Sequence, residues 1–183
     1  MLELDDIRGD FLKKRPASWG ELPDLDLYMD QVVSYLGRTQ LAPEGAQKLT
    51  AAMVNNYVKE GLLPRAKGKR YERPHVALLQ LFVALKEVVT VKDAGLLLKL
   101  YVGTESVETC YEKLIERLGE ALDQTVAVLP GGDGHDELVD AAIGYALMSY
   151  ATKMASQRVL EIIKEREAAK TAALEEKAKR EKS

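Results

Sequence analysis

The chain has 183 residues, of which 46% are hydrophobic and 30% charged, and its formal net charge at pH 7 is −3. Six prolines and 13 glycines give no sign of low complexity, so the composition is typical of a soluble globular protein. The negative net charge argues against a protein that coats nucleic acid indiscriminately.

Three features bear on the location of the protein. The N-terminal residues MLELDD are acidic and lack the basic start and apolar core of a secretory signal. The longest apolar run, VALLQLFVAL, is shorter than the roughly 20 residues that a membrane helix needs. The only cysteine, Cys110, falls at an apolar position of a helical pattern and cannot form an internal disulfide. We therefore expect a cytoplasmic protein without a membrane span.

The first part of the chain predicts two helices. Residues 1–20 show no sustained periodicity, whereas Asp24 is a candidate cap for a first helix with one apolar stripe: Leu25, Tyr28, Met29, Val32, Val33 and Leu36. Residues 37–48 carry two glycines and a proline and are predicted to be a connection. Thr50 is a candidate cap for a short second helix, which Gly61 would end.

A small hairpin and two more helices are predicted next. The residues LLPRAKGKRYER indicate a hairpin around AKGK, where glycine tolerates positive φ, with Pro64 at its edge. Pro74 suits the first position of a buried, mostly apolar helix that runs to about Val89. The residues TVKD match a capping box, with Thr90 as the cap of the following helix.

A fifth helix is predicted from Ser106 to about Val128, with an apolar face and a ridge of carboxylates that we expect to face water: Glu108, Glu112, Glu116 and Glu120. After PGGDGHDE, the pattern from Asp136 contains no helix breaker except Gly144. A stripe of small and apolar residues with near-heptad spacing predicts homodimerisation: Leu138, Ala141, Tyr145, Met148, Thr152, Ala155, Val159 and Ile162. Residues 164–183 offer little to bury and are predicted to be a frayed helical tail.

The charges are distributed unevenly along the chain. Residues 59–73 contain six basic and two acidic residues, an excess of four positive charges. Residues 104–140 contain ten acidic residues and only two basic ones, Lys113 and Arg117. The sequence therefore predicts a protein with one basic and one acidic surface.

Residue patterns that carry enzyme chemistry are not apparent in the sequence. His75 and His135 are far apart and belong to no metal-ligand spacing. The residues GGDG lack the lysine and the Ser or Thr of a phosphate-binding loop, and they do not follow the calcium-loop pattern. We expect no catalytic residues, no metal and no cofactor, and therefore a protein that is not an enzyme.

The succession of helix, glycine, LLP, basic hairpin, tyrosine, apolar helix and TVKDAGLLL resembles the winged helix-turn-helix of the MerR family of bacterial transcription regulators. The resemblance covers roughly Thr50 to Leu98 and implies a recognition helix at about 50–60 in the major groove of DNA. It also implies a basic wing at 62–73 on the DNA backbone.

Alignment with that family on Gly61 places Val54 and Tyr57 on two positions of its recognition helix, and Lys69 and Tyr71 on the R-x-Y of its wing. The chain departs from the pattern where the family has two arginines and a first tyrosine, since it carries Ala52, Asn55 and Asn56 there.

A closer resemblance is to the bacterial family catalogued as domain of unknown function 1836. Four segments carry it over most of the first hundred residues: WGELPDLDLYMDQV, LTAAMVNNYVK, GKRY and LLQLFVALKEVVTVKD. The name of this family implies no activity.

The predicted fold is mainly α: a MerR-like winged helix-turn-helix with an N-terminal helix over 1–102, a helical dimerisation region over 103–163, and the charged tail over 164–183. The predicted function is sequence-specific binding of double-stranded DNA by a transcription regulator, which would be a homodimer through helices within 104–163. The alternative is a protein-interaction module that keeps the winged-helix fold without binding DNA. No separate effector-binding domain is predicted.

The residues expected to bind DNA lie on the second helix and the hairpin: Lys48, Thr50, Asn55, Asn56, Arg65, Lys67, Lys69, Arg70 and Tyr71. A helix N-terminus favours phosphate, asparagine amides pair with adenine edges, and basic side chains hold phosphates. A polar helix face without a ligand remains open for the asparagines, and a solvated loop for the basic residues. For Tyr71, core packing and a phosphate hydrogen bond are equally open.

Overall fold

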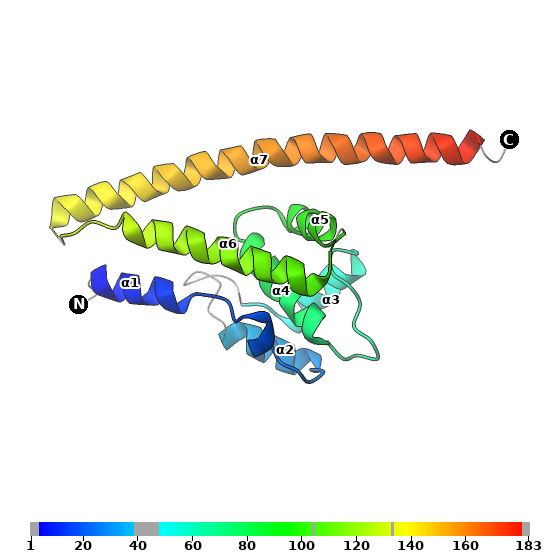
Figure 1. Ribbon diagram of the computed structural model, residues 1–183, viewed down its shortest axis with the longest axis horizontal. Helices are drawn as coiled ribbons and strands as arrows, with labels where there is room; N and C mark the ends of the chain where they lie inside the picture. Colours follow the sequence, from blue (N-terminus) through cyan, green and yellow to red (C-terminus); the bar gives the residue numbers. More distant parts are fainter. Residues whose placement is uncertain (1–3, 39–47, 104, 133, 181–183) are drawn as a thin grey trace. The chain divides into compact units, whose positions relative to one another are not determined.

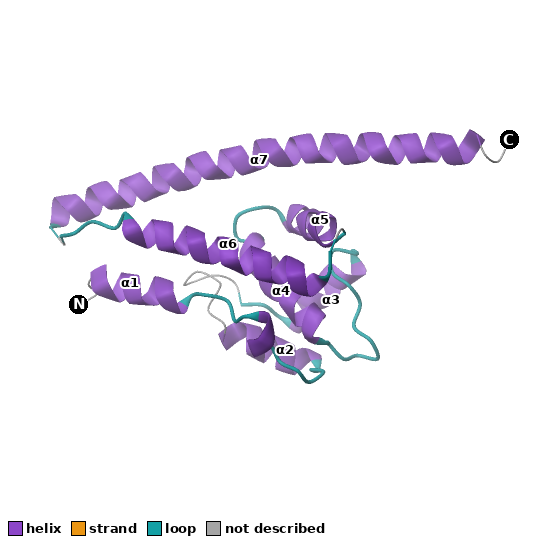
Figure 2. Cartoon of the chain, viewed as in Figure 1, coloured by secondary structure: helices purple, strands orange, loops and turns teal. Residues whose placement is uncertain are grey.

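The computed structural model describes residues 4–38, 48–103, 105–132 and 134–180. These residues form one short 3-10 helix, η1, and the α-helices in Figures 1 and 2: α1 (Leu4–Lys13), η1 (Trp19–Glu21), α2 (Met29–Arg38), α3 (Ala51–Lys59), α4 (Arg73–Leu85), α5 (Val91–Val102), α6 (Val107–Ala127) and α7 (His135–Arg180). The expectation of a mainly helical protein with a long C-terminal helix is confirmed. None of the described helices is both long and apolar enough to cross a membrane.

The chain divides into two compact units, Met1–Glu137 and Leu138–Ser183. Helix α6 belongs to the first unit because it packs on α1, α4 and α5. The boundary expected at residue 102 therefore does not coincide with this division.

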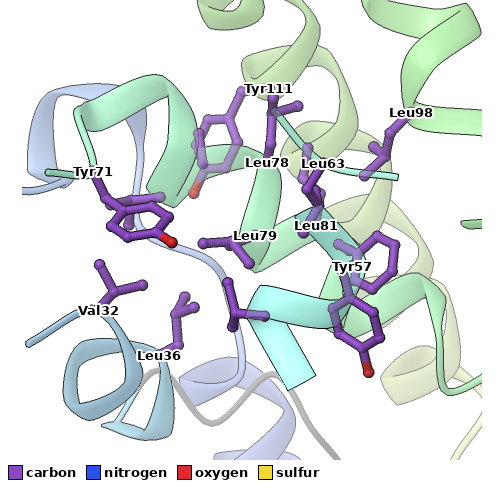
Figure 3. Packing of buried hydrophobic residues seen from close by; sticks show 14 of the residues in the cluster. Val32, Leu36, Tyr57, Leu63, Tyr71, Leu78, Leu79, Leu81, Leu98 and Tyr111 are labelled. Carbon is purple, nitrogen blue, oxygen red and sulfur yellow. The ribbon is translucent and has the colours of Figure 1, made fainter. Parts of the chain in front are cut away.

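Helix α4 is the centre of the first unit. Every residue from His75 to Phe82 is buried, as expected for a helix that is apolar on almost every side. Figure 3 shows side chains of α2, α3, α5 and α6 gathered around Leu78, Leu79 and Leu81 of this helix. The ring centroids of Tyr57 and Phe82 lie 4.7 Å apart, which fixes α3 against α4.

Local capping signals in the sequence position three helices. The hydroxyls of Thr50, Thr90 and Ser106 accept hydrogen bonds from backbone N–H groups three residues further on, at 3.2, 3.2 and 3.1 Å. Gly61 follows α3 with a φ of +72°, which glycine adopts without strain. The expected first residues of α3, α5 and α6 and the expected end of α3 are therefore confirmed. Helix α4, in contrast, ends at Leu85 rather than at about Val89.

The N-terminal region differs from the sequence prediction. Helix α1 was not expected, because its apolar residues show no regular spacing, and long-range contacts with the α6 region hold it. Arg8 donates to the Pro130 carbonyl at 3.0 Å, and Arg15, in the segment after α1, pairs with Asp123 of α6.

Helix α2 begins at Met29, and Asp24 does not cap it. The Asp24 carboxylate pairs instead with Arg73 at 2.7 Å, and the Tyr28 N–H donates to the Gln31 side chain at 2.9 Å. Leu25 is 79% exposed and lies outside the apolar face to which it was assigned. The connection predicted over 37–48 falls mostly outside the described residues.

The C-terminal helix includes most of the predicted tail. Helix α7 continues to Arg180, so the described part of the tail is helical. Ion pairs at helical spacing support it, including Lys170 with Glu167 at 2.5 Å and Arg180 with Glu176 at 2.5 Å. At 1.5 Å per residue its 46 residues extend about 70 Å.

A buried polar group joins the segment before η1 to the core. The Tyr111 hydroxyl lies 2.7 Å from the Ala17 carbonyl and 3.0 Å from the amide oxygen of Gln80. The Tyr111 side chain is fully buried, and this burial raises the pKa of its phenol. The contact fixes residue 17 to both α4 and α6.

We expect the Tyr111→Phe substitution to lower the free energy of unfolding by about 1–3 kcal/mol at pH 7, because it leaves Ala17 and Gln80 without this partner. The raised pKa means that the stabilising contribution of the neutral phenol is present below the unfolded pKa, about 10, and is lost as the pH rises above it. Urea unfolding between pH 9 and pH 11 should therefore show a shallower alkaline loss in the variant. Equal losses in both proteins would contradict this assignment.

Candidate nucleic-acid interface

Helix α3 buries one face and exposes the other. Val54 is fully buried and Tyr57 nearly so, which makes both of them core residues rather than candidates for contact with a ligand. Asn55 and Asn56 are exposed, and their amides form no hydrogen bonds within the part of the chain that the structure describes. The helix thus presents amide groups to solvent on a rigidly packed support.

The N-terminal end of α3 is open to solvent. Lys48 and Thr50 are both exposed, and the Thr50 hydroxyl accepts the Met53 N–H at 3.2 Å. The N–H groups and the positive end of the helix dipole at such a terminus favour an anion.

A tight turn, which we call the basic turn, consists of Lys67, Gly68, Lys69 and Arg70. The Lys67 N–H donates to the Arg70 carbonyl at 3.1 Å, and the Arg70 N–H donates to the Lys67 carbonyl at 2.9 Å. Gly68 and Lys69 have φ angles of +55° and +67°, the two left-handed conformations of a two-residue hairpin turn. Figure 2 shows the loop that carries this turn reaching out between α3 and α4.

The predicted hairpin is reduced to this turn. Lys67 and Arg70 form an isolated bridge, and the described residues contain no strand that extends beyond such a bridge. Pro64 has no N–H for a longer ladder, and Leu63 is buried in the core instead of lying along a partner strand. Tyr71 pairs instead with Leu27, through backbone hydrogen bonds of 2.8 and 3.0 Å.

The side chain of His75 holds both ends of the loop that carries the basic turn. The Glu72 N–H donates to Nδ1 of His75 at 3.2 Å, so that nitrogen is the acceptor and Nε2 carries the proton. Nε2 then donates to the Arg65 carbonyl, 3.0 Å away. His75 is only 8% exposed, so these two bonds, which we call the His75 clamp, are shielded from water.

The basic side chains around the clamp point into solvent. Lys67 pairs with Glu72 at 3.0 Å but remains 77% exposed. The Arg70 guanidinium lies 5.4 Å from the centre of the Tyr28 ring and 3.4 Å from its hydroxyl. Arg65 and Lys69 are exposed, and neither has a carboxylate partner among the described residues. The surface therefore has an excess of positive charge.

Tyr71 lies in the core rather than on this surface. It is 6% exposed, its ring meets His75 edge-on at 5.9 Å, and burial raises the pKa of its phenol. Of the two interpretations that the sequence left open, the position of Tyr71 favours packing.

Two residues of this region were not identified from the sequence. Tyr28 was assigned to a helical apolar stripe, and no spacing pattern connects it with Arg70, 42 residues away. His75 was considered only as a metal ligand, although it occupies the third position of α4, from which a side chain can accept the N–H of the capping residue.

Among the described residues, no group of three or more His, Cys, Asp or Glu side chains could hold a metal ion.

The acidic ridge of α6 lies elsewhere in the first unit. It lines an open groove of about 910 Å³ together with the segment around Arg15 and Ser18. Glu112 accepts the Trp19 N–H at 2.6 Å, so this member of the ridge is a structural contact rather than a fully solvated charge.

A family model described as "Domain of unknown function (DUF1836)" matches residues 17–114. The match begins at the residue whose carbonyl meets Tyr111, and it includes α2 to α5 and the first part of α6. Comparison with curated proteins and with solved structures found no match to the chain.

We expect the His75→Ala substitution to release the basic turn, because it removes both bonds of the His75 clamp. Trypsin should then cleave after Lys67, Lys69 or Arg70 faster than in the wild type, as measured by mass spectrometry of timed digests. Thr90→Ala is the matched control, since it costs about 1 kcal/mol at the cap of α5 without touching the loop. Equal acceleration in both variants would show global destabilisation and refute a local clamp.

Proposed function

The chain belongs to the family described as domain of unknown function DUF1836, and because that description assigns no activity, we propose from the residues themselves that it binds double-stranded DNA in a sequence-specific manner. The observation that carries the proposal is the arrangement of α3 and the basic turn. Both are anchored on the core around α4, and both expose side chains suited to DNA.

Recognition of bases is assigned to α3. The amides of Asn55 and Asn56 are exposed and have no partner within the described residues, and an asparagine amide can bond an adenine edge through both of its polar atoms. An α-helix fits the major groove of B-DNA. The helix would therefore act as the recognition helix of a MerR-like domain, with asparagines where that family has other residues.

Contacts with the DNA backbone are assigned to the ends of this surface. Lys48 and Thr50 would meet a phosphate at the N-terminus of α3, and the basic turn with Arg65 would take the place of the wing. Such contacts set affinity and register without reading sequence. Tyr71 supports the turn from within the core.

A homodimer is part of the proposal. Exposed apolar residues of α7, among them Met148, Val159 and Ile162, follow the near-heptad stripe predicted from the sequence. A dimer through this stripe would present two copies of α3 to an operator with two-fold symmetry. As a transcription regulator the protein would act in the cytoplasm, without catalysis and without a metal or cofactor.

The second candidate function is a protein-interaction module of the same fold. It is favoured by the lack of arginine on α3, where the resembling family carries two arginines and this chain has Ala52 and Asn55. In that case, the affinity for DNA would be negligible at every salt concentration.

We expect the full chain to bind labelled DNA from its own upstream region more tightly than scrambled DNA, with an affinity that falls steeply with salt because phosphate contacts release counterions. The triple variant Lys67→Ala, Lys69→Ala, Arg70→Ala should bind more weakly and have a salt slope that is smaller by up to about 3. Fluorescence anisotropy at several salt concentrations measures both quantities.

The control for this titration removes three exposed cations elsewhere, with Lys92→Ala, Lys153→Ala and Arg166→Ala. If this control flattens the slope as much as the basic-turn variant, only net charge matters. The Asn55→Ala, Asn56→Ala variant should lose the preference for the upstream DNA by about 1–3 kcal/mol per asparagine that pairs with a base, and keep its affinity for scrambled DNA. Absence of binding to either DNA at low salt would favour the interaction module.

For the dimer, we expect light scattering to give twice the mass of one chain over a wide concentration range. Met148→Glu with Val159→Glu should produce monomers, because the two charges would be buried without partners. Tyr150→Glu is the control, since Tyr150 is also exposed but lies on the opposite face of α7. A monomeric wild-type chain at all concentrations would refute the dimer.

A further inference from the structure

A second pocket lies against the loop that carries the basic turn. It has a volume of about 530 Å³ and lies between the start of that loop, the first turns of α4 and the end of α5. This volume is within the range of small-molecule sites, roughly 300–1,000 Å³.

The walls of the pocket are apolar and firmly packed. They include Leu62, Leu78, Leu98, Val102 and Val107, of which Leu78 and Leu98 belong to the core cluster. Leu62 is fixed against α5, because a Cβ added at Gly95 would lie only 2.8 Å from its Cδ2 atom. The walls therefore exist before any ligand arrives, which limits the entropy lost on binding.

Four side chains that can carry charge also line the pocket: Lys67, Glu72, His75 and Lys99. Three of them are already engaged. Glu72 pairs with Lys67 at 3.0 Å, and both ring nitrogens of His75 bond the backbone in the His75 clamp. Lys99 is exposed and has no carboxylate partner within the described ranges. The pocket thus combines apolar walls with one uncompensated ammonium group.

We propose that this pocket binds a small apolar monocarboxylate, with the carboxylate on the Lys99 ammonium and the apolar body against Leu62, Leu98 and Val102. A single ammonium suits a single negative charge, whereas a phosphate carries more charge and calls for several donors. The site contains no residue of α3, and it shares Lys67 with the basic turn.

Occupancy of the pocket also has a consequence that rests on the proposed function. Lys67 belongs both to the pocket and to the basic turn, so a carboxylate in the pocket lies near a cation assigned to the DNA backbone. The ligand then lowers DNA affinity, and DNA lowers the affinity for the ligand by the same factor.

The test uses the full chain with labelled methyl groups and 4-phenylbutyrate as the probe, with uncharged 4-phenylbutanamide as its isostere. NMR titration should show saturable shifts of the Leu98, Val102 and Val107 methyls, with roughly millimolar affinity for a ligand of this size. Lys99→Gln should weaken binding of the carboxylate roughly three- to tenfold and leave the amide unaffected. Lys92→Gln, on the same helix but outside the pocket, should change neither. Val102→Phe, which fills the space, should abolish the shifts that either ligand causes at the Leu98 and Val107 methyls.

Equal binding of the carboxylate and the amide, or an unchanged affinity in Lys99→Gln, would overturn the assignment of the anion. Shifts confined to methyls of α7, whose apolar residues are exposed, would overturn the site itself. These measurements contain no DNA, so failure of the chain to bind DNA would refute the proposed function and leave the ligand site standing.

Discussion

One buried imidazole determines how positive charge is displayed on this protein. The basic turn has only one pair of backbone hydrogen bonds of its own, between Lys67 and Arg70. A two-residue hairpin this short is not stable by itself in water. His75 joins Arg65 and Glu72 on either side of it, and Tyr71 pairs with Leu27. Because His75 belongs to α4, the turn is tied directly to the most deeply buried helix. The loop can therefore present cations without the sheet that usually supports a wing.

Local signals in the sequence predicted the helices that begin at caps. Thr50, Thr90 and Ser106 act within three residues of themselves, so their roles follow from short-range geometry alone. The burial of α4 followed from its composition. Helix α1 could not be predicted this way, because the contacts that hold it and the segment after it to the α6 region join residues more than a hundred positions apart. The contact between Tyr28 and Arg70 could not be predicted either, because it also joins residues that are far apart in the sequence. Of the candidate site, the exposure of Asn55 and Asn56 was predictable, and the His75 clamp was not.

Opposite charges are separated within the first unit. The basic turn carries three exposed cations and one nearby carboxylate, whereas α6 carries the acidic ridge. A chain with a net charge of −3 can still attract DNA when its cations are concentrated at one place, because screening at physiological salt confines each charge to about 8 Å. The carboxylates of the acidic ridge would also repel DNA that approached the protein with this ridge facing it. Charge separation thus favours a single docking orientation for the proposed complex.

The most direct test of the proposed DNA-binding surface is an NMR titration of the ¹⁵N-labelled full chain with a short duplex from its own upstream region. We expect the amide shifts to cluster at residues 48–56 and 67–70, with those of the α6 ridge unchanged. Shifts of the same size that cluster on α6 or α7, or no shifts at all at low salt, would contradict the assignment of α3 and the basic turn as the DNA-binding surface.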